Sequence, residues 1–306
     1  MFKFFQNIFL RNSLKSDIPG PNNHYSDFDY ENLCELYYKH SWLRTETNSR
    51  GFEDLWFDYK LKGEKIIIKR LIQNFKYLTL EEVEPICKEK LKNCIENWEL
   101  TPDNTYFIGF RTHKTPDGSS IVLNFFKPVL LSIDDTWKDC NLYPDVFIGK
   151  RRMNDEGIKN LILVDDFIGT GGTAFNRINE FRNEIDRLDL SLKLYVFSIG
   201  MMKEGAKLIR KSKTDYQCCY ILDKGSILAF PKLIAELARK AIKRMEGILH
   251  EGSEKLKLTD HSLGYGKSET LYSFSRFNLP NNNYPIFWWN KYRNGDKRKS
   301  MFNRMQ

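Results

Sequence analysis

Two adjacent carboxylates and a run of glycines and threonines lie close together in the middle of the chain. Asp165 and Asp166 follow the apolar run Leu161–Val164, and the segment Gly169, Thr170, Gly171, Gly172, Thr173 comes shortly after them. Glycines allow close approach of the backbone to a ligand, and free N–H groups at a helix start bind anions. Carboxylates accept hydrogen bonds from sugar hydroxyls and can hold Mg²⁺ through water. The pattern predicts a site for a ligand with a phosphate at one end and ribose hydroxyls nearby.

Two familiar phosphate-binding motifs do not fit this segment. No Gly-Lys-Ser/Thr follows, so it is not a Walker A loop. The acidic pair precedes the glycines, whereas a dinucleotide fingerprint has its acidic residue about 20 residues beyond them. The remaining alternative is a tight turn with solvated aspartates at a strand end.

The elements that must position these residues alternate between short apolar runs and amphipathic stretches. The expected strands are Tyr106–Phe110, Ile121–Phe126, Val146–Gly149, Leu161–Val164, Leu194–Ile199 and Cys219–Leu222, and the expected helices cover about 173–188, 203–212 and 231–249. This alternation predicts an α/β domain with a mainly parallel sheet flanked by helices. Asp165 and Asp166 then lie at the carboxyl end of a central strand, where ligands of open α/β sheets bind.

Leu161–Thr173 resembles the phosphoribosyl pyrophosphate signature of the type I phosphoribosyltransferases, which has a hydrophobic strand, two acidic residues, two apolar residues and a phosphate loop. The resemblance implies their Rossmann-like fold, with Asp165 and Asp166 on the ribose hydroxyls and Gly169–Thr173 on the 5′-phosphate. Two positions depart from the signature. Phe167 is bulkier than the usual residue, and Gly169 replaces the aspartate that 6-oxopurine salvage enzymes carry near the purine, which disfavours that class.

The resemblance also implies two upstream loops, one for the pyrophosphate and one that closes over the reacting centre. The candidates are Gly109, Arg111, His113 and Lys114 for the first loop, and Lys150, Arg151, Arg152 and the polar stretch to Asn160 for the second. The basic stretch could equally be an ordinary solvated connection. Asp117–Ser120 could bind an anion at a helix start or form only a turn.

A second resemblance concerns the residues after the α/β region. Leu263–Gly266 and Leu279–Trp289 resemble the C-terminal extension of prokaryotic phosphoribosyltransferase-like proteins associated with conflict or anti-phage systems. Trp288 and Trp289 could form a hydrophobic plug that holds the extension to the core, or a stacking wall for a base. This resemblance implies an effector in such a defence system.

Composition and charge divide the chain of 306 residues into three expected parts. These are a mainly helical region (1–100), the α/β core (101–250) and an irregular or β extension with a basic tail (251–306). The net charge is +8, and residues 291–306 hold six Lys and Arg against a single Asp. That tail could be a solvated arm or could contact nucleic acid.

The mean hydropathy of −0.52 and the absence of a long apolar run predict no membrane span. No signal peptide is recognisable, and no cysteine lies at zinc-ligand spacing, so we expect a reduced, cytoplasmic protein.

Two functions remain open at this point. The first is a glycosyltransferase that binds phosphoribosyl pyrophosphate or a related nucleotide with Mg²⁺, where the catalytic residues would be Asp165, Asp166 and Arg111. Asp165 and Asp166 would also face the metal, and Arg151 and Arg152 would help to bind the ligand. The second is an inactive nucleotide-sensing module that regulates a protein partner through the N-terminal helices, or contacts nucleic acid through the tail.

Overall fold

The computed structural model describes residues 25–110, 118–254, 256–275 and 277–304. The chain divides into two compact units, Met1–Ser41 and Trp42–Gln306. The described part of the first unit contains helix α2 (Asp27–Lys39). This helix begins after Ser26, whose side-chain oxygen accepts a hydrogen bond from the N–H of Asp29. Arg111, His113, Lys114 and Asp117 lie outside the described residues.

The second unit alternates helices with short strands. Its helices are α3 (Glu46–Asp58), α4 (Lys62–Gln73), α5 (Leu80–Asn97), α6 (Gly118–Leu131), α7 (Val146–Arg152), α8 (Gly172–Arg187), α9 (Lys203–Lys211), α10 (Gly225–Ala229), α11 (Lys232–Met245) and α12 (Leu258–His261). Its strands are β1 (Lys76–Leu78), β2 (Thr105–Gly109), β3 (Leu142–Tyr143), β4 (Asn160–Ile168), β5 (Lys193–Met202), β6 (Asp215–Leu222), β7 (Gly252–Ser253), β8 (Leu256–Lys257) and β9 (Tyr272–Phe274).

Five of these strands form one parallel sheet in the order β3-β2-β4-β5-β6. The central strand β4 carries the run Leu161–Val164, whose four residues are completely buried. Such a continuous apolar run is typical of a parallel strand covered on both faces. The predicted α/β architecture with a parallel sheet is therefore confirmed.

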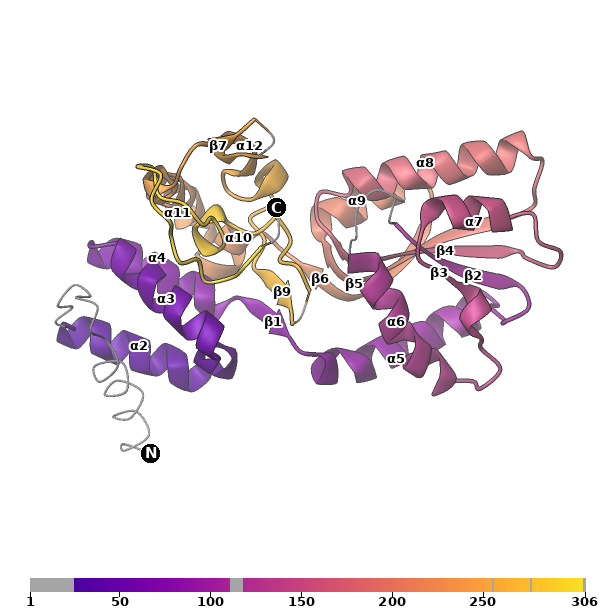
Figure 1. Ribbon diagram of the computed structural model, residues 1–306, viewed down its shortest axis with the longest axis horizontal. Helices are drawn as coiled ribbons and strands as arrows, with labels where there is room; N and C mark the ends of the chain where they lie inside the picture. The colour runs from indigo at the N-terminus through magenta and orange to yellow at the C-terminus, as the bar shows by residue number, and fades with distance from the viewer. Residues whose placement is uncertain (1–24, 111–117, 255, 276, 305–306) are drawn as a thin grey trace. The chain divides into compact units, whose positions relative to one another are not determined.

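Helices cover both faces of this sheet (Figure 1). On one face, α5 and α6 contribute apolar residues that include Leu91 and Phe126. On the other face, α7, α8 and α9 contribute Val146, Phe181 and Ile209 to a second apolar cluster. Because each helix returns the chain to the start of the next parallel strand, the carboxyl ends of all the strands lie at one edge of the sheet. The acidic pair of β4 belongs to that edge.

The predicted strand over Ile121–Phe126 is wrong, since these residues lie inside α6. Val122, Phe126 and Val129 are buried at helical spacing, and the helix packs against β4 and beside α5. An apolar run does not by itself distinguish a buried helix from a buried strand. At 14 residues α6 is too short to cross a bilayer, and none of the helices in the described chain combines the length and apolarity that a span needs.

The predicted strand over Val146–Gly149 is also wrong, because this segment begins α7. Asp145 is the N-cap, and its Oδ1 accepts hydrogen bonds from the N–H groups of Phe147 and Ile148 at 2.8 and 3.0 Å. A capping aspartate before an apolar run is a helix start signal that outweighs the short β-like pattern. The outer strand of the sheet, next to β2, is instead β3, which comes shortly before the capping Asp145.

The helices α3 and α4 share a core with the C-terminal extension. β1 pairs in parallel with β9, and α4 contacts α10 and α11. The hydroxyl of Tyr59 donates to the backbone oxygen of Met245 at 2.9 Å, and Phe75 stacks on Phe302 with 5.1 Å between ring centroids. Segments far apart in the sequence therefore build this part of the second unit together.

Part of the basic tail, residues 298–302, is packed against the rest of the second unit, whereas Lys291, Arg293, Lys297 and Lys299 are exposed. Arg298 is only 1 % exposed, and its Nε lies 2.8 Å from Oδ2 of Asp58. Met301 and Phe302 are buried as well. The expectation of a solvated arm is therefore wrong for residues 298–302, where Arg298 and two apolar side chains fasten the chain to α3 and to neighbouring aromatic residues.

Candidate functional site

The acidic pair is half-buried and is followed by the last two residues of β4, Phe167 and Ile168, which are buried. Oδ1 of Asp165 accepts a hydrogen bond from the N–H of Asp166 at 3.0 Å. A Cβ atom at Gly118 would overlap the Asp166 carboxylate, so this carboxylate lies against the first residue of α6. The positive end of the helix dipole favours a carboxylate there. Glycine at position 118 leaves the space that the carboxylate occupies.

The segment Gly169–Thr173 turns the chain from β4 into α8. Gly171 has a φ of +83°, and a Cβ at this position would lie 2.9 Å from the Cα of Gly205. Glycine is thus required both by the backbone conformation and by the close approach of α9. α8 begins at Gly172 and runs for 16 residues, so its first N–H groups, which have no intrahelical partner, face this turn. The segment has the parts of an anion-binding loop, and its ligand stays a prediction.

The proposed pyrophosphate loop begins beside the acidic pair. Gly109 ends β2 and pairs with Val164 of β4. A Cβ at Gly109 would lie 2.7 Å from Oγ of Ser119, so the start of α6 packs directly against this glycine. Oγ of Ser120 is buried and has no hydrogen-bond partner in the described chain. Gly109 and the first turn of α6 therefore join the acidic pair at one edge of the sheet.

The structure does not bring Arg151 and Arg152 to that edge. Both belong to the last turn of α7, whereas the sequence suggested a closing loop. Nη1 of Arg152 lies 3.6 Å from Oδ2 of Asp155, which accepts a hydrogen bond at 2.8 Å from the hydroxyl of Tyr106. Tyr106 is near the start of β2, while Gly109 is at its end. Arg151 and Arg152 therefore belong to the opposite edge and do not join the acidic pair.

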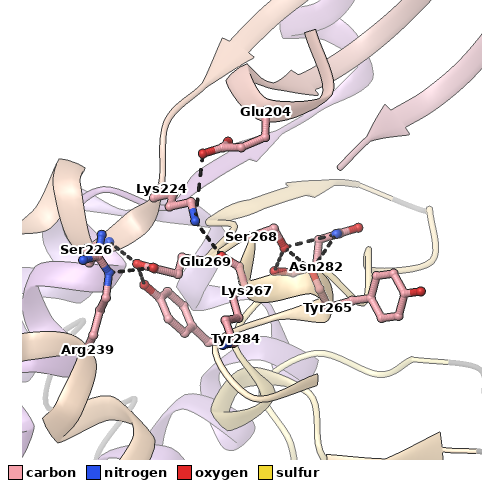
Figure 2. A network of polar contacts seen from close by, with 10 residues as sticks. All are labelled: Glu204, Lys224, Ser226, Arg239, Tyr265, Lys267, Ser268, Glu269, Asn282 and Tyr284. Carbon is pink, nitrogen blue, oxygen red and sulfur yellow. Dashed lines mark hydrogen bonds and ion pairs between the residues drawn. The ribbon is translucent and has the colours of Figure 1, made fainter. Parts of the chain in front are cut away.

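The C-terminal extension supplies a wall of the site that the sequence did not assign to it. A Cβ at Gly266 would overlap Cγ2 of Thr170, and a Cβ at Gly169 would overlap the carboxamide of Asn282. Both contacts join the extension to the loop between β4 and α8. Asn282 itself is held by the network around Ser268 and Tyr265 (Figure 2). The only sequence signal was the Gly-Tyr-Gly and Pro-Asn elements of the second resemblance.

Phe167 departs from the usual signature because it packs against the extension. Its ring stacks on Tyr272 of β9 with 4.9 Å between centroids and 22° between planes. The hydroxyl of Tyr272 is buried without a hydrogen-bond partner in the described chain. Burial raises the pKa of this hydroxyl well above its usual range, and the nearby charge of Asp166 raises it further. Tyr272 is therefore a neutral polar group close to the acidic pair.

The tryptophan pair does not form an exposed stacking surface. Trp288 and Trp289 are 1 % and 3 % exposed. Nε1 of Trp288 donates to the backbone oxygen of Asn283 at 3.1 Å, and His261 packs against both rings. This burial agrees with the predicted hydrophobic plug and leaves no ring face free for a base.

A cation from the tail lies near the acidic pair. The guanidinium of Arg304 lies over the ring of Trp288, 5.6 Å from its centroid, and donates to the backbone oxygen of Leu279. Burial lowers the pKa of Arg304, and the Asp166 carboxylate opposes this shift by stabilising the charged form. From the sequence, Arg304 is only one cation of a basic tail. The local pattern does not indicate that Arg304 approaches Asp166.

The acidic pair could help to hold a divalent cation. The described chain contains no group of three or more His, Cys, Asp and Glu side chains suited to a metal ion. Mg²⁺ usually keeps several waters and binds through one or two carboxylates together with the phosphates of a substrate. Asp165 and Asp166, half-buried and adjacent, fit that shared mode of binding. They do not make a protein-only metal cage.

Comparison with known proteins shows the family of the chain. No curated protein matches the chain. Among solved structures it is similar to the Helicobacter pylori xanthine-guanine-hypoxanthine phosphoribosyltransferase, with 13 % identity and a TM-score of 0.29 over 48 % of this chain and 83 % of that one. The profile of the PRTase-CE family matches residues 40–304, which include the α/β core and the extension. The chain therefore belongs to the PRTase-CE family and is a phosphoribosyltransferase-like protein with a C-terminal extension.

Proposed function

We propose that this protein binds phosphoribosyl pyrophosphate, or a related nucleotide, and transfers the phosphoribosyl group to an acceptor. One observation carries the proposal. The acidic pair and the Gly171 turn follow each other at the carboxyl end of the central parallel strand, beside the N-terminal end of α6. In this order the hydroxyls of a ribose 5-phosphate would lie at the carboxylates and its phosphate at the start of α8.

Each part of the site has a distinct role in this proposal. Asp165 and Asp166 accept hydrogen bonds from the ribose hydroxyls and favour the positive charge that develops on the sugar ring. The first N–H groups of α8, with the Thr170 and Thr173 hydroxyls, bind the 5′-phosphate. The bond from the anomeric carbon to pyrophosphate breaks with its electron pair on the leaving oxygen, and a nitrogen of the acceptor forms the new bond and loses its proton.

The leaving pyrophosphate needs positive charge around it. Gly109 allows close approach of the backbone on this side, and Arg111 is the proposed cation of the same loop, outside the described residues. Mg²⁺, when bound with the pyrophosphate, would neutralise the charge that develops on the leaving group. Asp165 and Asp166 would hold that ion through water.

A double substitution tests the assignment of the acidic pair. We expect Asp165→Asn with Asp166→Asn to weaken binding of phosphoribosyl pyrophosphate in the presence of Mg²⁺ by about tenfold or more, because each carboxylate loses its charge-assisted hydrogen bonds. Isothermal titration calorimetry measures the affinity, and release of pyrophosphate over a panel of bases measures turnover.

The chain offers a matched control in a second adjacent acidic pair. Asp134 and Asp135 are exposed in the turn after α6. Asp134→Asn with Asp135→Asn removes the same charge, so we expect unchanged affinity. Unchanged affinity in the Asp165/Asp166 variant would reject the site, and tight binding without turnover on any base would favour the nucleotide-sensing module.

We also propose that the site acts in a prokaryotic anti-phage or conflict system. The support is the resemblance of the extension to that of proteins from such systems. If the proposal is correct, a host that carries the gene with its neighbours resists phage, and the Asp165/Asp166 variant loses this protection while the Asp134/Asp135 variant keeps it. If both variants protect equally in a plaque assay, protection against phage does not depend on the nucleotide site.

A further inference from the structure

The carboxamide of Asn282 occupies the space in which residue 169 would carry a side chain. Asn282 is 8 % exposed, and a Cβ built at Gly169 would overlap its Cγ, Nδ2 and Oδ1. The amide plane therefore lies directly across the Cα of Gly169. Any larger residue at 169 would displace Asn282, so glycine at 169 and asparagine at 282 form one structural feature built from two distant segments.

Hydrogen bonds fix which way this amide is turned. Nδ2 donates to the backbone oxygen of Tyr265 at 3.2 Å and to Oγ of Ser268 at 3.1 Å (Figure 2). A backbone carbonyl is only an acceptor, so the amide nitrogen must face Tyr265. Oδ1 then points to the other side, and no residue in the described ranges donates a hydrogen bond to it. An amide oxygen that accepts no hydrogen bond from the protein is available to a donor group of a ligand.

The loop that carries these partners is held in an unusual conformation. Between positions 263 and 269, positive φ values occur at Leu263 (60°), Gly264 (82°), Gly266 (64°), Lys267 (55°) and Glu269 (51°). Non-glycine residues rarely adopt such angles, and they persist where the surroundings determine the conformation, often at functional sites. The loop is thus built to one shape, and that shape places Asn282 and Gly266 against the β4–α8 turn.

A buried carboxylate maintains this conformation. Glu269 is 2 % exposed and accepts hydrogen bonds from Nε of Arg239 at 2.7 Å, the hydroxyl of Tyr284 at 3.0 Å and the N–H of Ser226 at 3.3 Å. The backbone oxygen of Asn282 accepts from Oγ of Ser268 at 3.0 Å. Figure 2 shows Glu269 with Arg239, Ser226 and Tyr284, and the preceding residue in the chain, Ser268, bonded to Asn282. The position of the amide is therefore fixed from outside the α/β core.

The position of Gly169 decides what the amide can contact. Gly169 lies between the acidic pair and the helix start at Gly172, and Phe167 is turned into the core. On the proposed function, the ribose spans these same two groups, and an amide that fills the side-chain position of residue 169 would lie beside the sugar and its substituent. We propose that Asn282 of the extension recognises the acceptor, and that its Oδ1 accepts a hydrogen bond from an N–H group of a nucleobase.

This assignment selects a chemical class. An amide oxygen whose nitrogen is already engaged can only accept, so it favours a base edge with an amino group or a protonated ring nitrogen and disfavours an edge that presents a carbonyl or an unprotonated ring nitrogen. Adenine and cytosine carry an amino group that can donate to Oδ1. Nucleotides of these bases should therefore bind more tightly than analogues in which the amino group is dimethylated and has no N–H.

The test compares nucleotide binding with binding of the sugar phosphate alone. Isothermal titration calorimetry measures ribose 5-phosphate, the nucleoside 5′-monophosphates and the dimethylamino analogues of adenosine and cytidine monophosphate. For the wild type we expect at least one unmodified nucleotide to bind about tenfold more tightly than its analogue. Asn282→Ala should remove that difference and leave the affinity for ribose 5-phosphate within about threefold of the wild type. Asn281→Ala, at the neighbouring half-buried amide, is the matched control and should keep the difference.

The other outcomes are distinct. Retained discrimination in Asn282→Ala, or an equal loss for ribose 5-phosphate and nucleotides, would overturn the role of Asn282 and leave the proposed function intact. If the wild type binds neither ribose 5-phosphate nor phosphoribosyl pyrophosphate, the proposed function is overturned, and this inference with it. If Asn282→Ala does not fold, Asn282→Ser, which keeps a small polar side chain but has no oxygen at the place of Oδ1, should give the same selective loss, and retained discrimination there would equally overturn the inference.

Discussion

Single buried carboxylates hold the extension in shape. Glu246 is 3 % exposed and accepts hydrogen bonds from Oγ of Ser262 at 2.6 Å and the N–H of Leu263 at 2.8 Å. Together with Glu269, it fixes the two ends of the loop that reaches the β4–α8 turn. At the residue scale, the conformation of this loop thus depends on the two buried carboxylates Glu246 and Glu269.

Glu246 makes stability depend on pH in a direction opposite to that of most carboxylates. Burial raises the pKa of Glu246 from about 4.5 to about 7, despite the two hydrogen bonds that favour its charged form. Between these values the folded state holds a proton that the unfolded chain has lost. The contribution of protonated Glu246 to the free energy of unfolding is therefore fully present below about pH 4.5. It is lost as the pH rises through about 7.

We expect Glu246→Gln to remove this dependence. The shift corresponds to about 3 kcal/mol of unfolding free energy across the interval. Urea unfolding at several pH values between 5 and 8 measures it, with Glu251→Gln at an exposed glutamate as control. Parallel pH profiles for the wild type and Glu246→Gln would show that burial does not perturb this carboxyl.

At the scale of elements, one ion pair joins α3 to the tail. Nε of Arg298 lies 2.8 Å from Oδ2 of Asp58, and its Nη atoms donate to the backbone oxygens of Trp289 and Ile286 at 3.0 and 2.9 Å. The hydroxyl of Tyr292 donates to the other oxygen of Asp58 at 2.7 Å. One of the six cations of the basic tail, Arg298, is thus hydrogen-bonded inside the protein.

Arg298→Ala should destabilise the protein by about 3–5 kcal/mol, because it leaves the Asp58 carboxylate buried without its cation. Thermal and urea unfolding measure the loss. Lys297→Ala, which removes an exposed neighbouring charge, should change stability by no more than about 0.5 kcal/mol. Similar small effects in both variants would mean that the tail is not anchored through this pair.

At the scale of the whole molecule, the α/β core needs residues outside positions 101–250. The helix α5 contributes Val83, Cys87, Leu91 and Cys94 to the apolar cluster on one face of the sheet. The division at Ser41 leaves this helix, α3, α4 and the extension in one unit with the core. The extension is therefore part of the same folded body as the sheet.

We expect a fragment of residues 42–306 to fold and a fragment of residues 101–250 to aggregate or to expose apolar surface. The shorter fragment lacks α5, so one face of its sheet is uncovered. Circular dichroism, thermal unfolding and binding of a hydrophobic dye distinguish the two results. Cooperative unfolding of the shorter fragment as a monomer would show that the core is independent.

The sequence alone determined the segment from β4 into α8. An apolar run, an acidic pair and Gly169–Thr173 are neighbours in the chain, so their order already implies a buried strand, its exposed end and a helix start. The local sequence did not identify the type of secondary structure that short apolar runs adopt. Ile121–Phe126 and Val146–Gly149 have strand-like composition, yet packing against the sheet and the cap at Asp145 make both helical.

Only the tertiary structure decided what surrounds that segment. Nothing near Gly169 in the sequence indicates that Asn282 fills its missing side chain, or that Arg304 lies near Asp166. Conversely, Arg151 and Arg152 have the right chemistry for a pyrophosphate but belong to the other edge of the sheet. The physical reason is that a local pattern sets backbone conformation, whereas contacts between distant segments depend on how buried groups such as Glu269 and Arg298 pack.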